Sequence, residues 1–283
     1  MKLNNVNAEI FVPDNKPVEE ALPRTTHLGI AAHQDDLEIM AYDGILKCFG
    51  SEKNWFLGVT VTNGAGSPRN GLYAHYTDED MQKVRRMEQK KAAMVGEYGA
   101  MVFLDYASSA VKDPKNQNVL ADLKTLFAFA KPSVVYTHNP ADKHDTHVAV
   151  ALKTIHALRE LPEEIKPKQV YGCEVWRDFD WMTDSDKVAL DVSAHENLAA
   201  SLLGVYDSQI CGGKRYDIAT IGRRRANATY YASHGVDTST YLIYAMDLTP
   251  LIRGPKLNIK AYIQEYIDRF SREVAEKIEK LGY

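Results

Sequence analysis

Short apolar segments alternate with longer amphipathic ones along this chain, and this alternation restricts the folds it can adopt more than any other feature. Five segments rich in β-branched and aromatic residues, each bounded by turn residues, are typical of buried strands: 27–33, 55–64, 100–107, 133–139 and 169–175. Between them, apolar residues recur every three or four positions, as in helices, over 78–98, 119–130 and 144–161. The pattern predicts an α/β, Rossmann-like three-layer fold with a mostly parallel sheet.

The two ends of the chain differ from this pattern. Residues 1–25 are polar and contain three prolines, so we expect an arm that crosses the surface or meets another subunit. Residues 26–283 contain no internal repeat and no Ser/Gly linker, which predicts one α/β domain with a C-terminal elaboration from about residue 180. The elaboration is expected to hold strands at 187–193 and 239–248, a helix at 196–206 and a long amphipathic helix at 256–281.

The composition limits which binding partners and which cellular compartment we expect. A formal net charge of -4 over 283 residues gives no basic footprint, so neither nucleic acid nor a membrane surface is an expected partner. Cys48, Cys173 and Cys211 form no C-x-x-C pair, which predicts reduced thiols, and no apolar run suggests an export signal or a membrane span. We therefore expect a cytoplasmic protein. The arm and the last helix would suit a homo-oligomer.

A histidine and two carboxylates follow the first predicted strand. The segment AAHQDDLE, residues 31–38, places His33, Asp35 and Asp36 beyond the strand, where ligands bind in open parallel sheets. Burying these side chains would cost roughly several kcal/mol unless a cation or hydrogen bonds compensate. Adjacent residues of an extended segment point in different directions, so one aspartate can bind a metal while the other faces water. The alternative is that both only cap the following helix.

A second cluster follows the strand predicted at 133–139. The segment HNPADKHDTH, residues 138–147, places His144 and His147 three residues apart at the start of a helix. Residues at this spacing share a helix face, so one imidazole can bind a metal while the other acts on a substrate. An isolated pair of this kind also occurs as solvated or capping residues. Two such clusters at one sheet edge favour a functional site.

Four motifs, in the same order, resemble those of the PIG-L and LmbE-like deacetylases. AHQDDLE is similar to their A-H-P-D-D-x-E and DKHDTH to their D-x-H-P-D-H. VTNGAG at 61–66 is similar to their V-T-D-G-x-G loop, and 85–100 to their R-x-x-E helix before a glycine turn. The resemblance spans about residues 27–180. It implies a zinc-dependent hydrolase that deacetylates an N-acetylated amino sugar or glycoconjugate, with one Zn²⁺ per chain.

Carried over by position, the resemblance also assigns roles to single residues. It implies three zinc ligands: His33, Asp36 and His147. Two histidines and a carboxylate form a known catalytic zinc set that leaves one position open for water. The resemblance further implies that Asp35 is the general base and that His144 stabilises the oxyanion or passes a proton. Asp142 would orient His144, and Arg85 would contact the sugar.

Two other functions stay open on the sequence. The same activation of water serves metal-dependent hydrolases of another amide, an ester or a phosphoester, although two-metal phosphoesterases need more than one set of three ligands. A non-catalytic Rossmann-like domain could instead bind a carbohydrate or a nucleotide. The segment GAGSPRNG, residues 64–71, lacks the glycine spacing of dinucleotide-binding and Walker loops.

The resemblance assigns no role to three further features. Glu38 is expected to support the ligands from behind. The consecutive arginines 223–225 follow a predicted loop and are expected to form a solvated face, although one of them could clamp an anionic substrate group. Trp176 could line the rim of a pocket.

Overall fold

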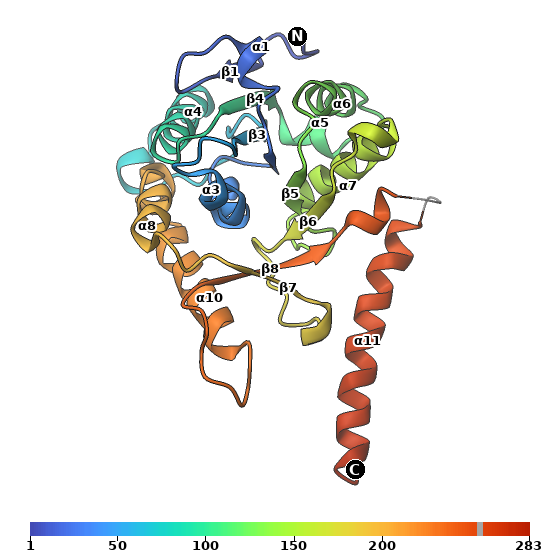
Figure 1. Ribbon diagram of the computed structural model, residues 1–283. Coiled ribbons are helices and arrows are strands. Elements are labelled where there is room, and N and C mark those ends of the chain that lie inside the picture. The colour runs from blue at the N-terminus through green and yellow to red at the C-terminus, as the bar shows by residue number, and fades with distance from the viewer. Residues whose placement is uncertain (254–256) are drawn as a thin grey trace.

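An eight-stranded mixed sheet runs through the computed structural model of the chain, which describes residues 1–253 and 257–283 (Figure 1). Its five central strands are parallel, in the order β4 (Ala100–Tyr106), β3 (Phe56–Thr62), β2 (His27–Ala31), β5 (Val134–His138) and β6 (Gln169–Cys173). All five lie within the segments that the alternation pattern predicts. The α/β, Rossmann-like, mostly parallel sheet is therefore confirmed.

Antiparallel strands extend the sheet at both edges. At one edge, β1 (Glu9–Phe11) pairs with β4, so part of the segment 1–25 joins the sheet. At the other edge, β8 (Leu242–Asp247) pairs with β6, and β7 (Val188–Asp191) pairs with β8. Both of these last strands fall where the sequence predicts them. The division of the chain at residue 25 stays a prediction.

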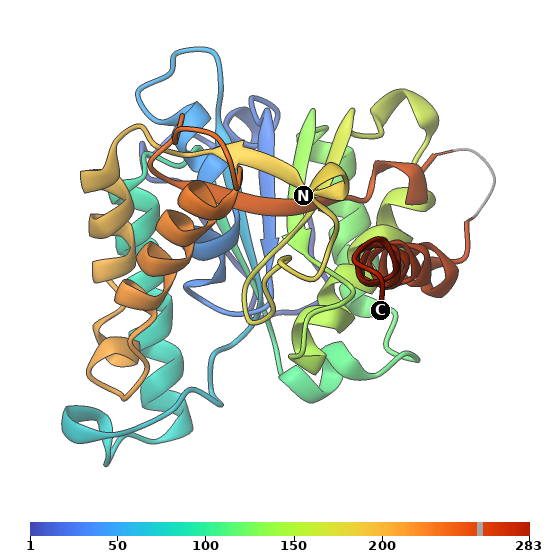
Figure 2. The ribbon, with the colours of Figure 1, turned by 90° about the horizontal axis from the view of Figure 1, so that it is seen from below.

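Helices cover the two faces of the sheet (Figures 1 and 2). One face carries α5 (Ser108–Lys112), α6 (Asn118–Ala130) and α7 (Asp145–Arg159). The other carries α2 (Asp36–Met40), α3 (Tyr42–Cys48), α4 (Asp78–Val95) and α8 (Glu196–Gly204). Next to them, α9 (Asp207–Ile210) contacts α4, and α10 (Tyr216–Tyr230) packs against α8 and β8. The remaining short helices are α1 (Val18–Ala21) and the 3-10 turns Gly71–Tyr73, Glu163–Ile165, Asp184–Asp186 and Thr249–Leu251.

The core is divided by the sheet into two layers. Along β4, Val102 and Leu104 point into the layer beneath α6 and α7, while Met101 and Phe103 point into the layer beneath α2 and α4. All four side chains are buried. This alternation is the period of two that a strand imposes on its side chains. Burial on both faces explains why the parallel strands are continuous apolar runs.

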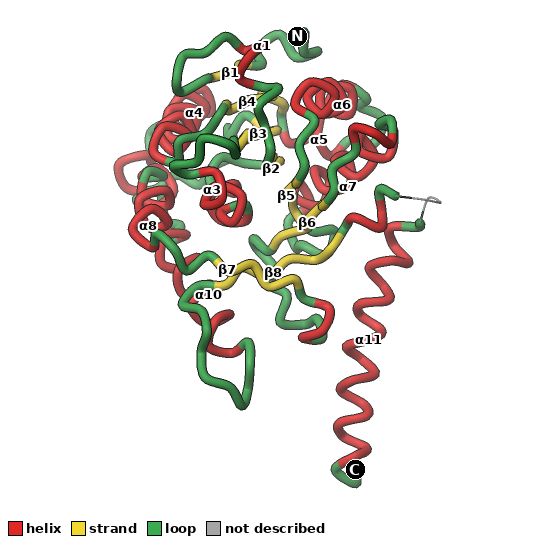
Figure 3. The backbone as a smooth tube through the Cα atoms, in the orientation of Figure 1, coloured by secondary structure: helices red, strands yellow, loops and turns green. Residues whose placement is uncertain are grey.

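The last helix, α11 (Ile259–Lys280), extends away from the rest of the fold (Figures 1 and 3). It begins after Asn258, whose side chain accepts a hydrogen bond from the Ala261 N–H; the predicted start at residue 256 lies outside the described residues. Of its side chains only Ile263 and Tyr266 are buried. No helix among the described residues is long and apolar enough to cross a bilayer.

Candidate functional site

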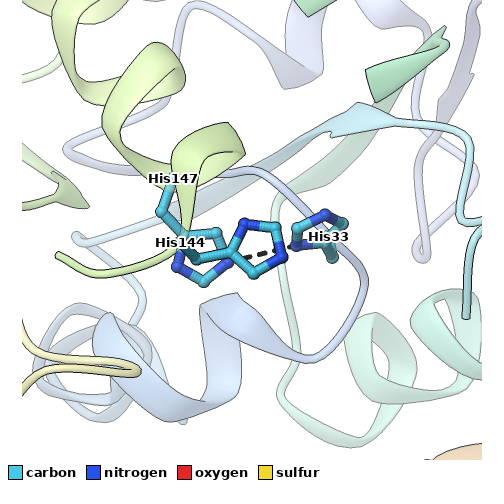
Figure 4. Close-up of side chains that lie close together, drawn as sticks. All are labelled: His33, His144 and His147. Carbon is cyan, nitrogen blue, oxygen red and sulfur yellow. Dashed lines mark hydrogen bonds between the residues drawn. The ribbon is translucent and has the colours of Figure 1, made fainter. Parts of the chain in front are cut away.

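Three histidines, one from the loop after β2 and two from the start of α7, meet beyond the carboxyl ends of β2 and β5, which are neighbours in the sheet (Figure 4). Nδ1 of His33 lies 3.1 Å from Nε2 of His147. The ring of His144 lies 5.0 Å from that of His33 and 4.5 Å from that of His147, measured between centroids. The two clusters predicted from the sequence therefore form one site, as expected for strand ends at one edge of a parallel sheet.

The Asp36 carboxylate completes this arrangement. Its Oδ2 lies 3.3 Å from Nδ1 of His33 and 3.4 Å from Nε2 of His147, and it accepts a hydrogen bond from the His33 N–H at 2.7 Å. Burial alone would raise the pKa of Asp36, but His147, His138 and His33 outweigh it and hold the pKa well below its usual range. Burial lowers the pKa of His147 to about 4. The site thus offers one carboxylate and imidazole nitrogens, the donor types that transition metals bind.

His138, the last residue of β5, lies beneath this site and was missed by the sequence analysis. Its ring stacks on that of His147 with centroids 3.9 Å apart, and its Nε2 lies 3.4 Å from Oδ2 of Asp36. The same Nε2 accepts a hydrogen bond from the Ala32 N–H at 2.8 Å. Because that hydrogen bond occupies the lone pair, His138 suits a supporting role better than metal ligation. His138 ends a buried strand, and the sequence there contains no motif that would identify it as a site residue.

Asp35 lies next to this site in a strained backbone conformation. Its φ of 93° lies in the region that favours glycine, at a cost of about 1–3 kcal/mol for other residues. Its Oδ2 is 3.2 Å from Nη2 of Arg85, which also donates to the carbonyl of Gln34. Burial raises the pKa of Asp35 to about 7, with Arg85 opposing and Asp36 adding to the rise. A carboxylate with a pKa near neutrality is suited to exchange protons at physiological pH.

A buried network supports the backbone of Asp35. Its N–H donates to Oε1 of Gln89 at 3.3 Å, and Nε2 of Gln89 donates to Glu38 at 2.8 Å. The hydroxyls of Tyr98 and Tyr206 each donate to the Glu38 carboxylate at 2.6 Å. Glu38 therefore supports the site, as the sequence suggests. It does so by accepting a hydrogen bond from Gln89, which contacts Asp35, and not by contacting a histidine.

His144 is the N-cap residue of α7. Its Nδ1 accepts a hydrogen bond from the Thr146 N–H at 3.3 Å, which leaves the proton of the neutral ring on Nε2. Burial lowers the pKa of His144, with His33 adding to the effect, which favours this neutral form. The imidazole can therefore donate a hydrogen bond from Nε2 at neutral pH.

Asp142 contacts both of the histidines that follow it. Its Oδ1 accepts a hydrogen bond from the backbone N–H of His144 at 3.0 Å, and its Oδ2 lies 3.5 Å from Nδ1 of His147. Oδ2 also accepts from the Trp176 N–H at 3.1 Å. The carboxylate thus faces the ring of His147, whereas the resemblance pairs it with His144. A carboxylate behind an imidazole fixes the ring orientation and the tautomer.

These residues open into a cavity of about 600 Å³. His33, Asp35, Asp36, Arg85 and His144 all contribute to its walls. His147 and Asp142 are buried behind this surface. The size of the cavity suits a small molecule.

Residues from the C-terminal part of the chain also line the cavity. Trp176 lines it, as the sequence suggested, with its ring 6.2 Å from that of His144. Glu174 and Arg224 line it as well, although both are buried. The consecutive arginines lie within α10, not after a loop, and Arg224 is 2% exposed, so the expected solvated face holds for Arg225 but not for Arg224.

Comparison with known proteins identifies relatives of this fold. A family model described as PIG-L, GlcNAc-PI de-N-acetylase, matches residues 28–158. Among solved structures, the 4-carboxy-2-hydroxymuconate hydratase GalB from Pseudomonas putida KT2440 is 17% identical with a TM-score of 0.61, over 83% of this chain and 98% of that chain. The N,N′-diacetylchitobiose deacetylase from Pyrococcus horikoshii is 16% identical with a TM-score of 0.59, over 78% and 83%. The zinc inhibited form of teicoplanin deacetylase Orf2 is 14% identical with a TM-score of 0.56, over 79% and 97%. Curated protein sequences give no match.

The structural matches show a shared fold, and the family model adds a match in sequence. The matched residues 28–158 run from β2 to α7 and include both histidine clusters, the Arg85 helix and the loop after β3. The fold and the sequence motifs thus point to the same family of proteins. Over residues 28–158, the chain therefore matches the PIG-L family, whose model is described as GlcNAc-PI de-N-acetylase.

Proposed function

We propose that this chain is a zinc-dependent hydrolase that removes the acetyl group from an N-acetylated amino sugar or glycoconjugate. The observation that carries the proposal is the triangle of donor atoms from His33, Asp36 and His147, with sides of 3.1, 3.3 and 3.4 Å. Ligands of a tetrahedral zinc ion with bonds of about 2.0–2.1 Å lie about 3.3 Å from one another. The three atoms therefore fit one ion.

The donor set supports zinc and a catalytic role. Two imidazoles and one carboxylate leave a fourth position of the ion open. When bound, zinc would lower the pKa of water toward about 7 and polarise the carbonyl of the substrate. The zinc inhibited form of teicoplanin deacetylase, which shares this fold, is consistent with a metal site in such proteins.

Asp35 is proposed as the general base. It lines the cavity, lies between His33 and Asp36 in the chain, and burial raises its pKa to about 7. Its ion pair with Arg85 at 3.2 Å holds the carboxylate in place. Asp35 would take a proton from water during attack and return it to the leaving amine, for which its pKa is well placed.

His144 and Arg85 are proposed to act on the substrate. The Nε2–H of His144 would donate to the oxygen on which negative charge develops, a contact that stabilises the transition state more than the ground state. Arg85 lines the cavity and would hold the substrate beside Asp35. Asp142 would fix the ring of His147 through the 3.5 Å contact at Nδ1.

Metal analysis and acetate release test the proposal together. The purified protein is analysed for bound metal and incubated with N-acetylglucosamine, N-acetylgalactosamine and N,N′-diacetylchitobiose, with and without a chelator. We expect about one zinc per chain and acetate release that the chelator abolishes and added zinc restores. A protein without stoichiometric metal, or one that releases phosphate from phosphoesters but no acetate, would contradict it.

A further inference from the structure

The cavity is rich in positive charge, although the chain as a whole has a formal net charge of -4. Six cationic side chains line it against three carboxylates. Of those carboxylates, Asp35 pairs with Arg85 and Asp36 belongs to the proposed metal site. A cleft lined by one sign of charge raises the local concentration of ligands with the opposite sign. A bound divalent cation would increase this bias.

Three of these cations come from one region of the chain, because one precedes α10 by two residues and the other two lie within it. We refer to Lys214, Arg223 and Arg224 as the basic wall. All three line the cavity. Across residues 1–253 and 257–283, no carboxylate lies within 4.0 Å of the charged nitrogens of any of them. Cations without such partners can bind a charged ligand without breaking an existing ion pair.

Arg224 is the most buried member of the basic wall. Its Nη2 donates to the carbonyls of Glu38 and Ile39, at 2.6 and 3.2 Å, while Nε and Nη1 are buried and have no hydrogen-bond partner in the described structure. Burial lowers the pKa of Arg224 to about 10, so the guanidinium stays charged at neutral pH. A buried charge with free donors is costly unless a ligand pairs with it.

Lys214 and Arg223 are less buried than Arg224, and both are half-buried. The ammonium of Lys214 lies 5.0 Å from the centre of the Trp176 ring, which in turn is 6.2 Å from the ring of His144. Arg223 donates to the carbonyl of Val175. Lys214 is therefore connected to His144 through the single side chain of Trp176.

Glu174 is the carboxylate that shares this side of the cavity. Its Oε1 accepts from Nδ2 of Asn227 at 2.6 Å and from the Tyr244 N–H at 3.1 Å, and its Oε2 has no partner among the described residues. Burial raises the pKa of Glu174 to about 7, although Arg223 opposes the rise. A carboxyl that is partly protonated at neutral pH offsets little of the positive charge.

We propose that the basic wall binds an anionic group of the substrate, a carboxylate or a phosphate, while the acetamide lies at the metal site. The substrate class is therefore an N-acetylated small molecule that carries a negative charge, and this rests on the deacetylase function proposed above. The planar guanidinium of an arginine pairs with either anion through two parallel hydrogen bonds. A neutral N-acetyl sugar would leave these donors unpaired.

Matched substrates and variants test the basic wall. Deacetylation of N-acetylglucosamine is compared with that of its 6-phosphate and of N-acetylmuramic acid, which carry a phosphate and a carboxylate respectively. The comparison is repeated in the double variant Lys214→Met and Arg223→Gln. Arg224 is left unchanged because it holds the carbonyls of α2. Lys168→Met, which removes an exposed lysine outside the cavity, is the control.

We expect kcat/KM for at least one anionic substrate to exceed that for N-acetylglucosamine by about tenfold or more, as for a charge-assisted hydrogen bond. The excess should fall about tenfold in the double variant and persist in the control. Whichever anionic substrate shows it identifies the anion. Equal rates on all three substrates, or an excess that survives in a folded double variant, would overturn the proposal.

A direct binding measurement separates this proposal from the deacetylase function. If none of the three compounds releases acetate, their binding to the purified protein is measured by calorimetry. Tighter binding of an anionic compound that is lost in the double variant would retain the basic wall as an anion site and reject the deacetylase function. Equal binding of all three compounds would reject the anion site.

Discussion

Nδ1 of His33 lies 3.1 Å from Nε2 of His147, although 114 positions separate the two residues in the chain. The contact exists because β2 and β5 are parallel neighbours. Ile30 pairs with Thr137, and each of these residues is the last but one of its strand. Asp36 contacts both histidines through a single oxygen. Three donor atoms from two segments that are distant in the sequence therefore surround one position that a single metal ion could occupy.

Replacement of His33 should greatly weaken metal binding while preserving the fold. Its side chain is 24% exposed, so its loss disturbs packing less than loss of the buried His147. For His33→Ala we expect zinc affinity to fall by more than about 100-fold, which exceeds the usual effect of losing an outer partner of a ligand. Metal content after dialysis and the circular dichroism spectrum measure the two effects. His234→Ala, at an exposed histidine, is the control and should retain metal.

Asp35→Asn should separate catalysis from metal binding. The amide keeps the shape of the side chain and cannot accept a proton at neutral pH, so turnover should fall by at least about 100-fold. Metal content should stay near that of the native protein because Asp36, not Asp35, contacts the two histidines. If zinc is lost along with activity, the roles assigned to the two aspartates are wrong.

Two substitutions of His144 should distinguish its role as a helix cap from its role in catalysis. Asparagine is a strong N-cap residue and can replace the bond to the Thr146 N–H, whereas alanine cannot. We expect both variants to lose activity to a similar extent. Only His144→Ala should also lose stability, by about 1 kcal/mol, measured by urea denaturation. Activity that returns in the asparagine variant would show that His144 is only a cap.

Glu174→Gln should change how stability depends on pH. Burial raises the pKa of Glu174 from 4.5 to about 7, so between these values the folded protein keeps a proton that the unfolded chain has released. The free energy of unfolding therefore falls as the pH rises through this window, by at most about 3 kcal/mol, whereas glutamine carries no such proton.

The difference in the free energy of unfolding between Glu174→Gln and the native protein should therefore grow from pH 4.5 to pH 7.5. Urea denaturation of both proteins at several pH values measures it. Effects of pH on the metal site are common to both proteins and cancel in the difference. A constant difference across the range would show that Glu174 is ionised throughout.

The sequence was most informative where local pattern and global fold agree. The buried parallel strands produce apolar runs between turn residues, and the motifs at 31–38 and 142–147 occur where those strands end. Parallel topology then brings the motifs to one edge of the sheet. The convergence of His33 and His147 could therefore be predicted without coordinates.

Other parts of the site left no local signal. His138 ends a buried strand, where its position is indistinguishable from that of a core residue. Arg224 lies in α10, a helix that the sequence analysis did not find, between two arginines that are less buried. The strand β1 has only three residues and no alternation long enough to detect. These features depend on long-range packing, which single-sequence patterns do not record.

The pairing of β2 with β5 also makes the site sensitive to folding. An unfolded chain cannot hold His33 and His147 together, because their approach depends on strand register and not on neighbouring residues. Any ion that binds there selects the folded state, and at a concentration of 100 times its dissociation constant it would add about 2.7 kcal/mol to stability. The melting temperature should therefore rise with zinc concentration, and this readout requires no knowledge of the substrate.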